Sequence, residues 1–254
     1  MKHTIFVVTV FLSFFCCGQE ILNVPVKKRI RPEDTEVWKP KPSEVSVNEL
    51  TGVPSDAIVL FNGSNFDEWV SSVDYTAVKW SLNSDKSMTV KNEAGDIQTK
   101  RNFGDIQLHL EWKSPKKVKG EGQHRANSGV FFQGRYELQI LDSNNNDTYV
   151  NGQVGAMYKQ SIPLVKASSK TGDWNVYDIV YHAPLFNEKG IKVKPGTITV
   201  FHNGVLIQDH YEIKGTTEFR GLPKNKSHGK APIKLQDHKD NSGVCYRNIW
   251  VREL

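Results

Sequence analysis

The chain has 254 residues, a formal net charge of +5 and three cysteines. Part of the net positive charge comes from residues 26–44, and elsewhere aromatic residues do not alternate with basic ones as a nucleic-acid surface requires. We therefore expect no nucleic-acid partner. Cys245 is the only cysteine beyond residue 17, so the folded part of the chain has no second cysteine with which to form a disulfide.

The first segment, residues 1–17, has the features of a signal peptide. A short basic start precedes an apolar stretch over 5–15, which is too short to span a bilayer. Cys17, followed by Gly18, resembles the lipid-attachment cysteine of bacterial lipoproteins, although Phe14 and Phe15 depart from the usual pattern. The segment predicts export, either to the periplasm of a Gram-negative bacterium or to its membrane through a lipid anchor on Cys17.

Residues 18–54 follow as a segment rich in proline and charge. This composition is typical of an extended tether rather than of a packed domain. From residue 55 to residue 254 the pattern changes to short apolar runs separated by turn residues. We expect one folded domain over 55–254, which is long enough to bury a large core.

The domain contains repeated short runs rich in Val, Ile, Phe, Tyr, Trp and Thr, as strands prefer. These runs cover residues 57–63, 80–83, 87–92, 106–113, 128–134, 136–143, 174–183, 197–210, 231–238 and 247–254. Asn203-Gly204, between two alternating runs, predicts a β-hairpin. Because no segment has a sustained helical period, the sequence predicts an all-β fold, an antiparallel sandwich or jelly roll.

Residues 143–173 lack the strand rhythm. So long a connection in a compact domain is usually a functional loop. It follows the run 136–143 directly, so we expect it to lie over one face of that strand.

Polar side chains alternate with apolar ones along three of the predicted strands. In residues 136–141, Glu137 and Gln139 lie on the face opposite Tyr136, Leu138 and Ile140. Asp142 stands at the end of that strand. Carboxylate and amide groups held by a sheet can bind sugar hydroxyls directionally, whereas the alternative is an ordinary solvated face. We expect Glu137 and Gln139 to form the floor of a site.

The same alternation puts Glu111 on the polar face of the strand 106–113, and Gln236 and His238 on that of the strand 231–238. Asn127, before Ser128-Gly129, would add a donor from the neighbouring strand. Small residues such as Gly129 and Gly134 allow close approach of a ligand or of backbone.

Other chemistries lack their motifs. The sequence has no HExxH, no CxxC, no glycine-rich phosphate loop and no G-x-S-x-G elbow. The run that starts at Asp142 begins like a calcium loop, but Asp147 replaces the required glycine and Gln153 the twelfth-position glutamate. A divalent metal held by Glu, Asp and His remains open, because oxygen and imidazole ligands suit several ions. No other cofactor is expected.

Several segments, in order from about Ala57 to Leu254, resemble the bacterial 3-keto-disaccharide hydrolase family. They are IVLFNGSNFDEWV, LHLEWK, RANSGVFFQGRYELQILDS, GAMYKQSIPLVKASSKTGDWNVYDIVYHAP, ITVFHNGVLIQD and PIKLQDH with YRNIWVREL. The resemblance implies a concanavalin-A-like jelly roll. It also implies an enzyme that acts on glycosides already oxidised to a ketone at sugar carbon 3.

In such a substrate the ketone acidifies the C2 hydrogen, so a base can remove it and the enolate can expel the C1 aglycone; water then adds, for net hydrolysis. We expect Glu137 or His238 to be the base and the other to be the acid or a metal ligand, with Glu111 as a second carboxylate. Arg125, Asn127, Gln139 and Gln236 would hold sugar oxygens, and Arg125 or a bound cation would polarise the ketone. Asp142 would touch the substrate or brace the turn.

Two other functions stay open at this point. One is a carbohydrate-binding domain without catalysis, which would tolerate Glu137→Gln. The other is an ordinary glycosidase with two carboxylates, such as Glu111 and Glu137, about 5–10 Å apart. Because the sequence has no motif for an oxidoreductase cofactor, a separate enzyme would have to make the keto sugar.

Overall fold

The computed structural model describes residues 30–254, in two compact units that divide between Glu44 and Val45. The predicted signal peptide and Cys17 lie outside the described residues. In the first unit, residues 30–44 are exposed and contain one 3-10 helix, η1 (Pro32–Thr35). Within residues 30–254, no helix is both long and apolar enough to cross a membrane.

The second unit starts earlier than the expected domain boundary. Residues 45–54, predicted as the end of the tether, belong to this compact unit. Val47 pairs with Pro54 in an isolated antiparallel bridge, and the side-chain amide of Asn248 donates to the carbonyl of Thr51 at 3.0 Å. The boundary differs because these contacts depend on the folded chain, and the proline and charge content of residues 45–54 does not reveal them.

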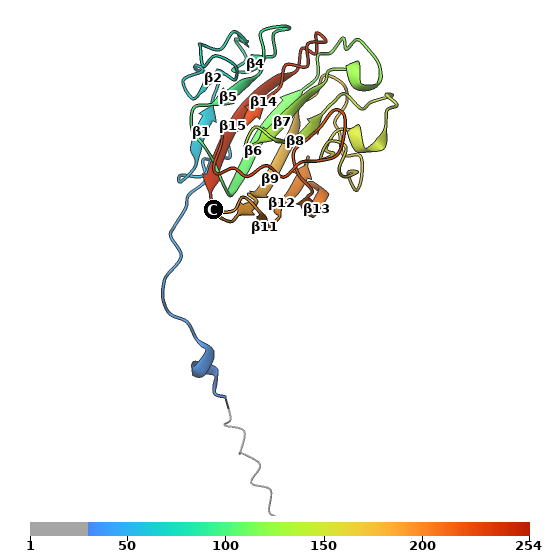
Figure 1. Cartoon of the computed structure of the whole chain (residues 1–254). Coiled ribbons are helices and arrows are strands. Elements are labelled where there is room, and N and C mark those ends of the chain that lie inside the picture. The colour runs from blue at the N-terminus through green and yellow to red at the C-terminus, as the bar shows by residue number, and fades with distance from the viewer. Residues whose placement is uncertain (1–29) are drawn as a thin grey trace, which may run out of the picture. The chain divides into compact units, whose positions relative to one another are not determined.

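The larger of the two main sheets has the strand order β13-β12-β9-β6-β15-β4-β3, and β1 pairs with β15 (Figure 1). Its strands are β1 (Ile58–Phe61), β3 (Ser81–Leu82), β4 (Met88–Thr89), β6 (Ile106–Lys113), β9 (Asn175–His182), β12 (Gly196–His202), β13 (Val205–Ile213) and β15 (Cys245–Glu253). All of its pairs are antiparallel.

The smaller sheet lies over the larger one and has the order β2-β5-β14-β7-β8 (Figure 1). Its strands are β2 (Trp69–Ser71), β5 (Ile97–Thr99), β7 (Ser128–Phe132), β8 (Tyr136–Ile140) and β14 (Lys234–Leu235). A separate two-stranded ribbon consists of β10 (Leu185–Phe186) and β11 (Lys192–Lys194). Two more 3-10 helices are η2 (Gly122–His124) and η3 (Val150–Gly152). The antiparallel jelly-roll sandwich expected from the sequence is confirmed.

The core fills the space between the two sheets, and period-two alternation supplies it. On β6, Leu108, Leu110 and Trp112 are buried, while the residues between them are only partly buried. On β8, Tyr136, Leu138 and Ile140 belong to the same apolar cluster. Because each strand sends every second side chain into the core, the polar side chains of β6 and β8 lie on the outer faces of the sandwich.

The predicted hairpin is present between β12 and β13. Asn203 and Gly204, the two turn residues, both have positive φ angles, 52° and 78°, as a two-residue hairpin turn requires. The predicted runs did not include β2, β5, β10 and β11, each of which has only two or three residues.

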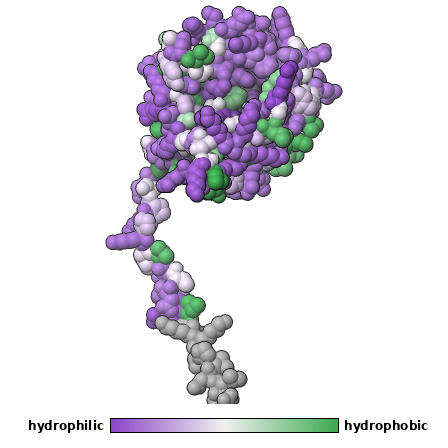
Figure 2. Space-filling model, in the orientation of Figure 1, coloured by the Kyte–Doolittle hydropathy of each residue, from purple (hydrophilic) through white to green (hydrophobic). Residues whose placement is uncertain are grey.

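The long connection over 143–173 folds back against β8, the last strand of the smaller sheet. The amide of Gln139 donates to the carbonyl of Ala156 at 3.0 Å, and the amide of Tyr158 donates to the carbonyl of Glu137 at 3.1 Å. The connection thus lies beside the edge of the Glu137 strand rather than over its face as expected, and Tyr158 extends from it to the cavity on the Glu137 face. The domain surface in Figure 2 is largely hydrophilic, and apolar side chains gather on it only in small patches.

Candidate functional site

A cavity of about 270 Å³ lies on the outer face of the smaller sheet. Its walls come from β7, β8, the segment after β14, the 143–173 connection and the 214–230 segment. The lining residues are Asn127, Phe131, Glu137, Gln139, Tyr158, Thr217, Phe219, Gln236 and His238. Five of the eight side chains that the sequence predicted for a site therefore meet in one place: Asn127, Glu137, Gln139, Gln236 and His238.

Strand register explains why these side chains share a face. Phe131 on β7 pairs with Glu137 on β8 and with Lys234 on β14, so these three form one row across the sheet. Gly129 pairs with Gln139, and the amide of Gln236 donates to the carbonyl of Gly129 at 3.1 Å, which forms the next row. Side chains in such rows point to the same side of the sheet.

Glu137 is buried, with 5% of its surface exposed, and its carboxyl group has no hydrogen bond to any residue that the structure describes. Burial raises the pKa of this carboxyl to about 8, although the charge of Lys234 acts in the opposite direction. Lys234 does not neutralise it directly, because its ammonium is held by Asp96 at 2.7 Å. A carboxyl kept uncharged in this way is typical of proton-transfer sites.

Two amide side chains that line the cavity each have a buried oxygen without a hydrogen-bond partner. Gln139 donates to Gln123 Oε1 at 3.1 Å and to Asn127 Oδ1 at 3.4 Å, and Asn127 donates to the carbonyl of Gln123 at 2.7 Å. The Oε1 atoms of Gln139 and Gln236 are buried without a partner.

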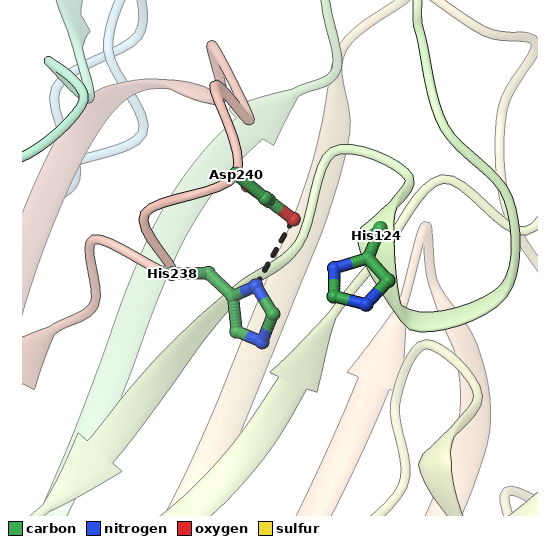
Figure 3. A group of neighbouring side chains, drawn as sticks. All are labelled: His124, His238 and Asp240. Carbon is green, nitrogen blue, oxygen red and sulfur yellow. Dashed lines mark hydrogen bonds and ion pairs between the residues drawn. The ribbon is translucent and has the colours of Figure 1, made fainter.

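At the cavity edge, His238 belongs to a cluster with His124 and Asp240 (Figure 3). His238 Nδ1 lies 3.0 Å from Asp240 Oδ2, and the His124 ring, on η2, faces the His238 ring at 5.9 Å between centroids. One ligand atom from each of the three residues lies within 4.8 Å of the others, and Asp240 Oδ1 is buried without a partner. Two imidazoles and a carboxylate form a donor set suited to a divalent transition metal.

Two predicted sugar contacts form an internal brace instead. Arg125 Nε donates to Asp142 Oδ1 at 3.2 Å, and Ser114 Oγ donates to Asp142 Oδ2 at 2.7 Å. Asp142 is buried at the end of β8, so its charge requires the nearby cation. Neither residue lines the cavity. The structure therefore places Arg125, predicted to hold sugar oxygens or the ketone, in a contact with Asp142, and Asp142 braces the turn.

Glu111 is also not part of this cavity, which corrects the prediction of a second carboxylate. It lies on the outer face of the larger sheet, opposite the core-facing Leu110 and Trp112, whereas Glu137 is on the outer face of the smaller sheet. The core therefore separates the two carboxyl groups. Alternation assigns each residue to a face of its own strand but does not reveal to which sheet the strand belongs.

The surroundings of Glu111 form a closed network of their own. Arg247 Nε donates to Glu111 Oε2 at 2.6 Å and Asn248 Nδ2 donates to Oε1 at 3.0 Å. Burial would raise the pKa of Glu111, but hydrogen bonds from His109, Asn248 and Arg247 outweigh it and lower that pKa to about 2. A carboxylate so strongly held in its charged form is a poor proton donor or acceptor near neutral pH.

Several residues of the site were not predicted from the sequence. His124 lies on the short 3-10 helix η2, and Asp240, Tyr158, Thr217 and Phe219 lie in loops. The spacing His238-x-Asp240 was a weak signal, because a carboxylate two residues from a histidine often bonds its ring. Nothing in the sequence joins residues 214–230 to β8, since that contact spans about 80 positions, as in the bond from the amide of Glu137 to Thr217 Oγ1 at 3.0 Å.

Residues 56–252 match the family model described as a 3-keto-alpha-glucoside-1,2-lyase-like domain. No curated protein matches the chain. Three similar crystal structures are candidate glycosyl hydrolases from Parabacteroides distasonis ATCC 8503. The first is 50% identical, with a TM-score of 0.84, and the match covers 89% of this chain and 97% of that one.

The second is 20% identical, with a TM-score of 0.58, and the match covers 78% of this chain and 94% of that chain. The third is 24% identical, with a TM-score of 0.54, and the match covers 78% of this chain and 99% of that chain. These two similarities support the fold alone. With the family model matching most of the described domain, the chain belongs to the 3-keto-disaccharide hydrolase family of 3-keto-alpha-glucoside-1,2-lyase-like domains.

Proposed function

We propose that this protein is an enzyme that cleaves glycosides carrying a ketone at carbon 3 of the sugar. A base removes the C2 proton, and the electron pair of that C–H bond passes to the C3 carbonyl as an enolate. The enolate then forms the C1–C2 double bond and expels the aglycone oxygen, which takes up a proton. Addition of water to the unsaturated sugar completes a net hydrolysis.

The observation that carries this proposal is the isolated carboxyl group of Glu137 in the cavity. Its pKa of about 8 makes its ionised form a stronger base than an ordinary carboxylate, while enough of that form is present near neutral pH. Among the described residues that line the cavity, Glu137 is the only carboxylic acid. This supports a mechanism with one base and argues against one with two carboxylates across a scissile bond.

A sugar ring matches the other groups of the cavity. The free Oε1 atoms of Gln139 and Gln236 would accept hydrogen bonds from two sugar hydroxyls, and Asn127 would position Gln139. A buried acceptor without a partner costs about 1–3 kcal/mol, so hydroxyl donors at these atoms would contribute to affinity.

His124, His238 and Asp240 would hold a divalent cation beside the cavity, because their donor atoms converge and Asp240 Oδ1 lacks any other partner. When bound, such an ion supplies Lewis-acid polarisation of a carbonyl oxygen. We assign His238 to this ligand set and the proton transfer to Glu137. The substrate would come from an enzyme that oxidises the C3 hydroxyl of a glycoside.

The test is to incubate the purified protein with a 3-keto-glucoside and with its unoxidised parent, with and without a chelator, beside the Glu137→Gln variant. We expect the aglycone to be released from the keto form alone, and the variant to lose about 10²–10⁴-fold in kcat. Binding without cleavage, unchanged in Glu137→Gln, would instead favour a carbohydrate-binding domain. Cleavage of the unoxidised parent would favour an ordinary glycosidase.

A further inference from the structure

The rim of the cavity carries an aromatic side chain that is exposed and yet firmly held. Phe219 lines the cavity with 69% of its surface exposed. A single exposed apolar side chain is common on protein surfaces, so exposure alone does not assign Phe219 a ligand. The assignment rests instead on its place at the cavity and on the contacts that hold it there.

The segment that carries Phe219 is fastened to β8 and to the 143–173 connection. Thr217 donates its amide to the carbonyl of Arg135 at 2.9 Å and accepts the amide of Glu137 on its Oγ1 at 3.0 Å. Two residues before Thr217, the carbonyl of Gly215 accepts from Gln160 Nε2 at 2.9 Å. Phe219 therefore has a backbone fixed from the same strand that carries Glu137.

Lys159 fixes Phe219 itself. Its ammonium donates to the carbonyl of Phe219 at 2.5 Å and lies 4.7 Å from the centre of the Phe219 ring. The same ammonium lies 5.6 Å and 5.5 Å from the rings of Tyr149 and Tyr158, whose hydroxyl groups hydrogen-bond to each other. A lysine surrounded by three rings is held by cation–π attraction as well as by its hydrogen bond.

The backbone of Lys159 indicates that this arrangement is costly to build. Its φ angle is +59°, in the left-handed region that residues other than glycine rarely adopt. Such a conformation persists where surrounding contacts enforce it. The backbone amide of Lys159 donates to the carbonyl of Asn151 at 2.7 Å, which is one of those contacts.

The depth of the cavity determines what Phe219 would touch. The hydrogen-bonding groups, Glu137 and Gln139, lie at the buried floor, and Phe219 lies at the rim. At about 270 Å³, the cavity is smaller than the roughly 300–1,000 Å³ that holds a drug-sized ligand, so it takes one sugar ring. The aglycone on C1 of that sugar must then lie at the rim.

We infer that Phe219 is a specificity-determining residue that stacks on the aglycone, and that Lys159 is the residue that positions it. The aglycone would present a ring with an apolar face, either an aromatic ring or the C–H face of a second sugar. This inference rests on the proposed function for the placement of the reacting sugar, and it adds the class of leaving group to it.

The experiment compares three 3-keto-glucosides that differ only in the aglycone: phenyl, glucosyl and methyl. Phe219→Ala should lower kcat/KM about tenfold or more for the phenyl compound, mainly through KM, and less than twofold for the methyl compound. Phe219→Trp should retain the preference. Lys159→Met, which keeps the aliphatic stem, should show the same aglycone-selective loss with kcat on the methyl compound unchanged. The glucosyl compound distinguishes a sugar face from an aromatic ring.

Equal losses on all three compounds, or none, would overturn the inference. Binding of unreactive phenyl and methyl glucosides to the wild type and to Phe219→Ala, measured by calorimetry, separates it from the proposed function. If no keto-glucoside is cleaved but Phe219→Ala selectively weakens phenyl glucoside binding, the proposed reaction fails and the stacking role stands. If cleavage occurs and this binding difference is absent, the stacking role fails alone.

Discussion

Gly129 lies directly beneath the carboxyl group of Glu137: a Cβ atom on residue 129 would lie 2.6 Å from Glu137 Oε1 and 3.0 Å from the Phe131 ring. Because Gly129 has no side chain, the carboxyl can lie flat against the neighbouring strand. The position of Glu137, the only carboxylic acid among the described residues that line the cavity, thus depends on the absence of a side chain at residue 129 on the neighbouring strand.

Gly129→Ala should therefore move the carboxyl of Glu137. We expect kcat/KM on a 3-keto-glucoside to fall about 10–100-fold, because a catalytic group misplaced by about 1 Å lowers the rate by about that factor. Overpacking should also lower the free energy of unfolding by about 1–3 kcal/mol. Gly134→Ala is the matched control. Gly134 has a positive φ of 65° and no atom within 4 Å of its Cβ position, so this variant should lose stability but not activity. Equal activity losses in both variants would contradict the role of Gly129.

The activity should rise with pH, because only the ionised form of Glu137 can accept the C2 proton. With a pKa of about 8 for this carboxyl, the ionised fraction increases about tenfold per pH unit below 8 and then levels off. A bound divalent cation nearby would shift the midpoint to lower pH. The measurement is kcat/KM between pH 5 and 9.5. A rate that falls as pH passes 8 would assign Glu137 as the acid instead of the base.

Glu137 should also make the fold less stable as the pH increases. Its carboxyl has a pKa raised from 4.5 to about 8 in the folded protein. Between these values the unfolded chain ionises and the folded chain does not, so the free energy of unfolding falls as pH rises and levels off above 8. Relative to Glu137→Gln, we expect the wild type to lose up to about 4 kcal/mol between pH 5 and 8.

Urea unfolding of both proteins at a series of pH values, in the presence of a chelator, measures this difference. Parallel pH curves for the two proteins would mean that the Glu137 carboxyl titrates normally. The interpretation of Glu137 as an isolated buried acid would then be wrong.

Removing either imidazole of the cluster should weaken cation binding. His124→Asn and His238→Asn should each weaken the binding of Mn²⁺ or Zn²⁺ by at least about tenfold, because each removes one of three ligands. His210→Asn, at an exposed position on β13, is the control. Calorimetric titration of the chelator-treated protein measures the affinities. If His238→Asn alone loses activity and all proteins bind the ion equally, His238 acts without a metal.

Glu111→Gln should leave activity within about twofold of the wild type, because the carboxyl lies across the core from the cavity. It should lower stability at neutral pH by about 1–3 kcal/mol, since Arg247 and Asn248 lose a charged partner. The pKa of Glu111 is lowered to about 2, so this contribution is present above the unfolded value of 4.5 and disappears as pH falls toward 2. A large activity loss with an unchanged fold would revive the two-carboxylate mechanism.

The sequence predicted the floor of the site because strand alternation is a local property. Glu137 and Gln139 share a face whatever the sheet order, and the same holds for Gln236 and His238. The rim could not be predicted in this way. Thr217 and Phe219 reach the cavity from a loop, and their positions depend on contacts between segments far apart in the chain. The mistaken grouping of Glu111 with Glu137 has the same origin, since alternation carries no information on which sheet a strand joins.

The segment 153–158, which pairs along β8, has one further effect. β8 ends the order of the smaller sheet, and a bare terminal strand exposes amides and carbonyls to which a strand of another molecule can add. By occupying these groups, the connection that supplies Tyr158 to the cavity also caps the sheet. Shortening this connection to widen the cavity would thus uncover a strand and favour self-association of the protein.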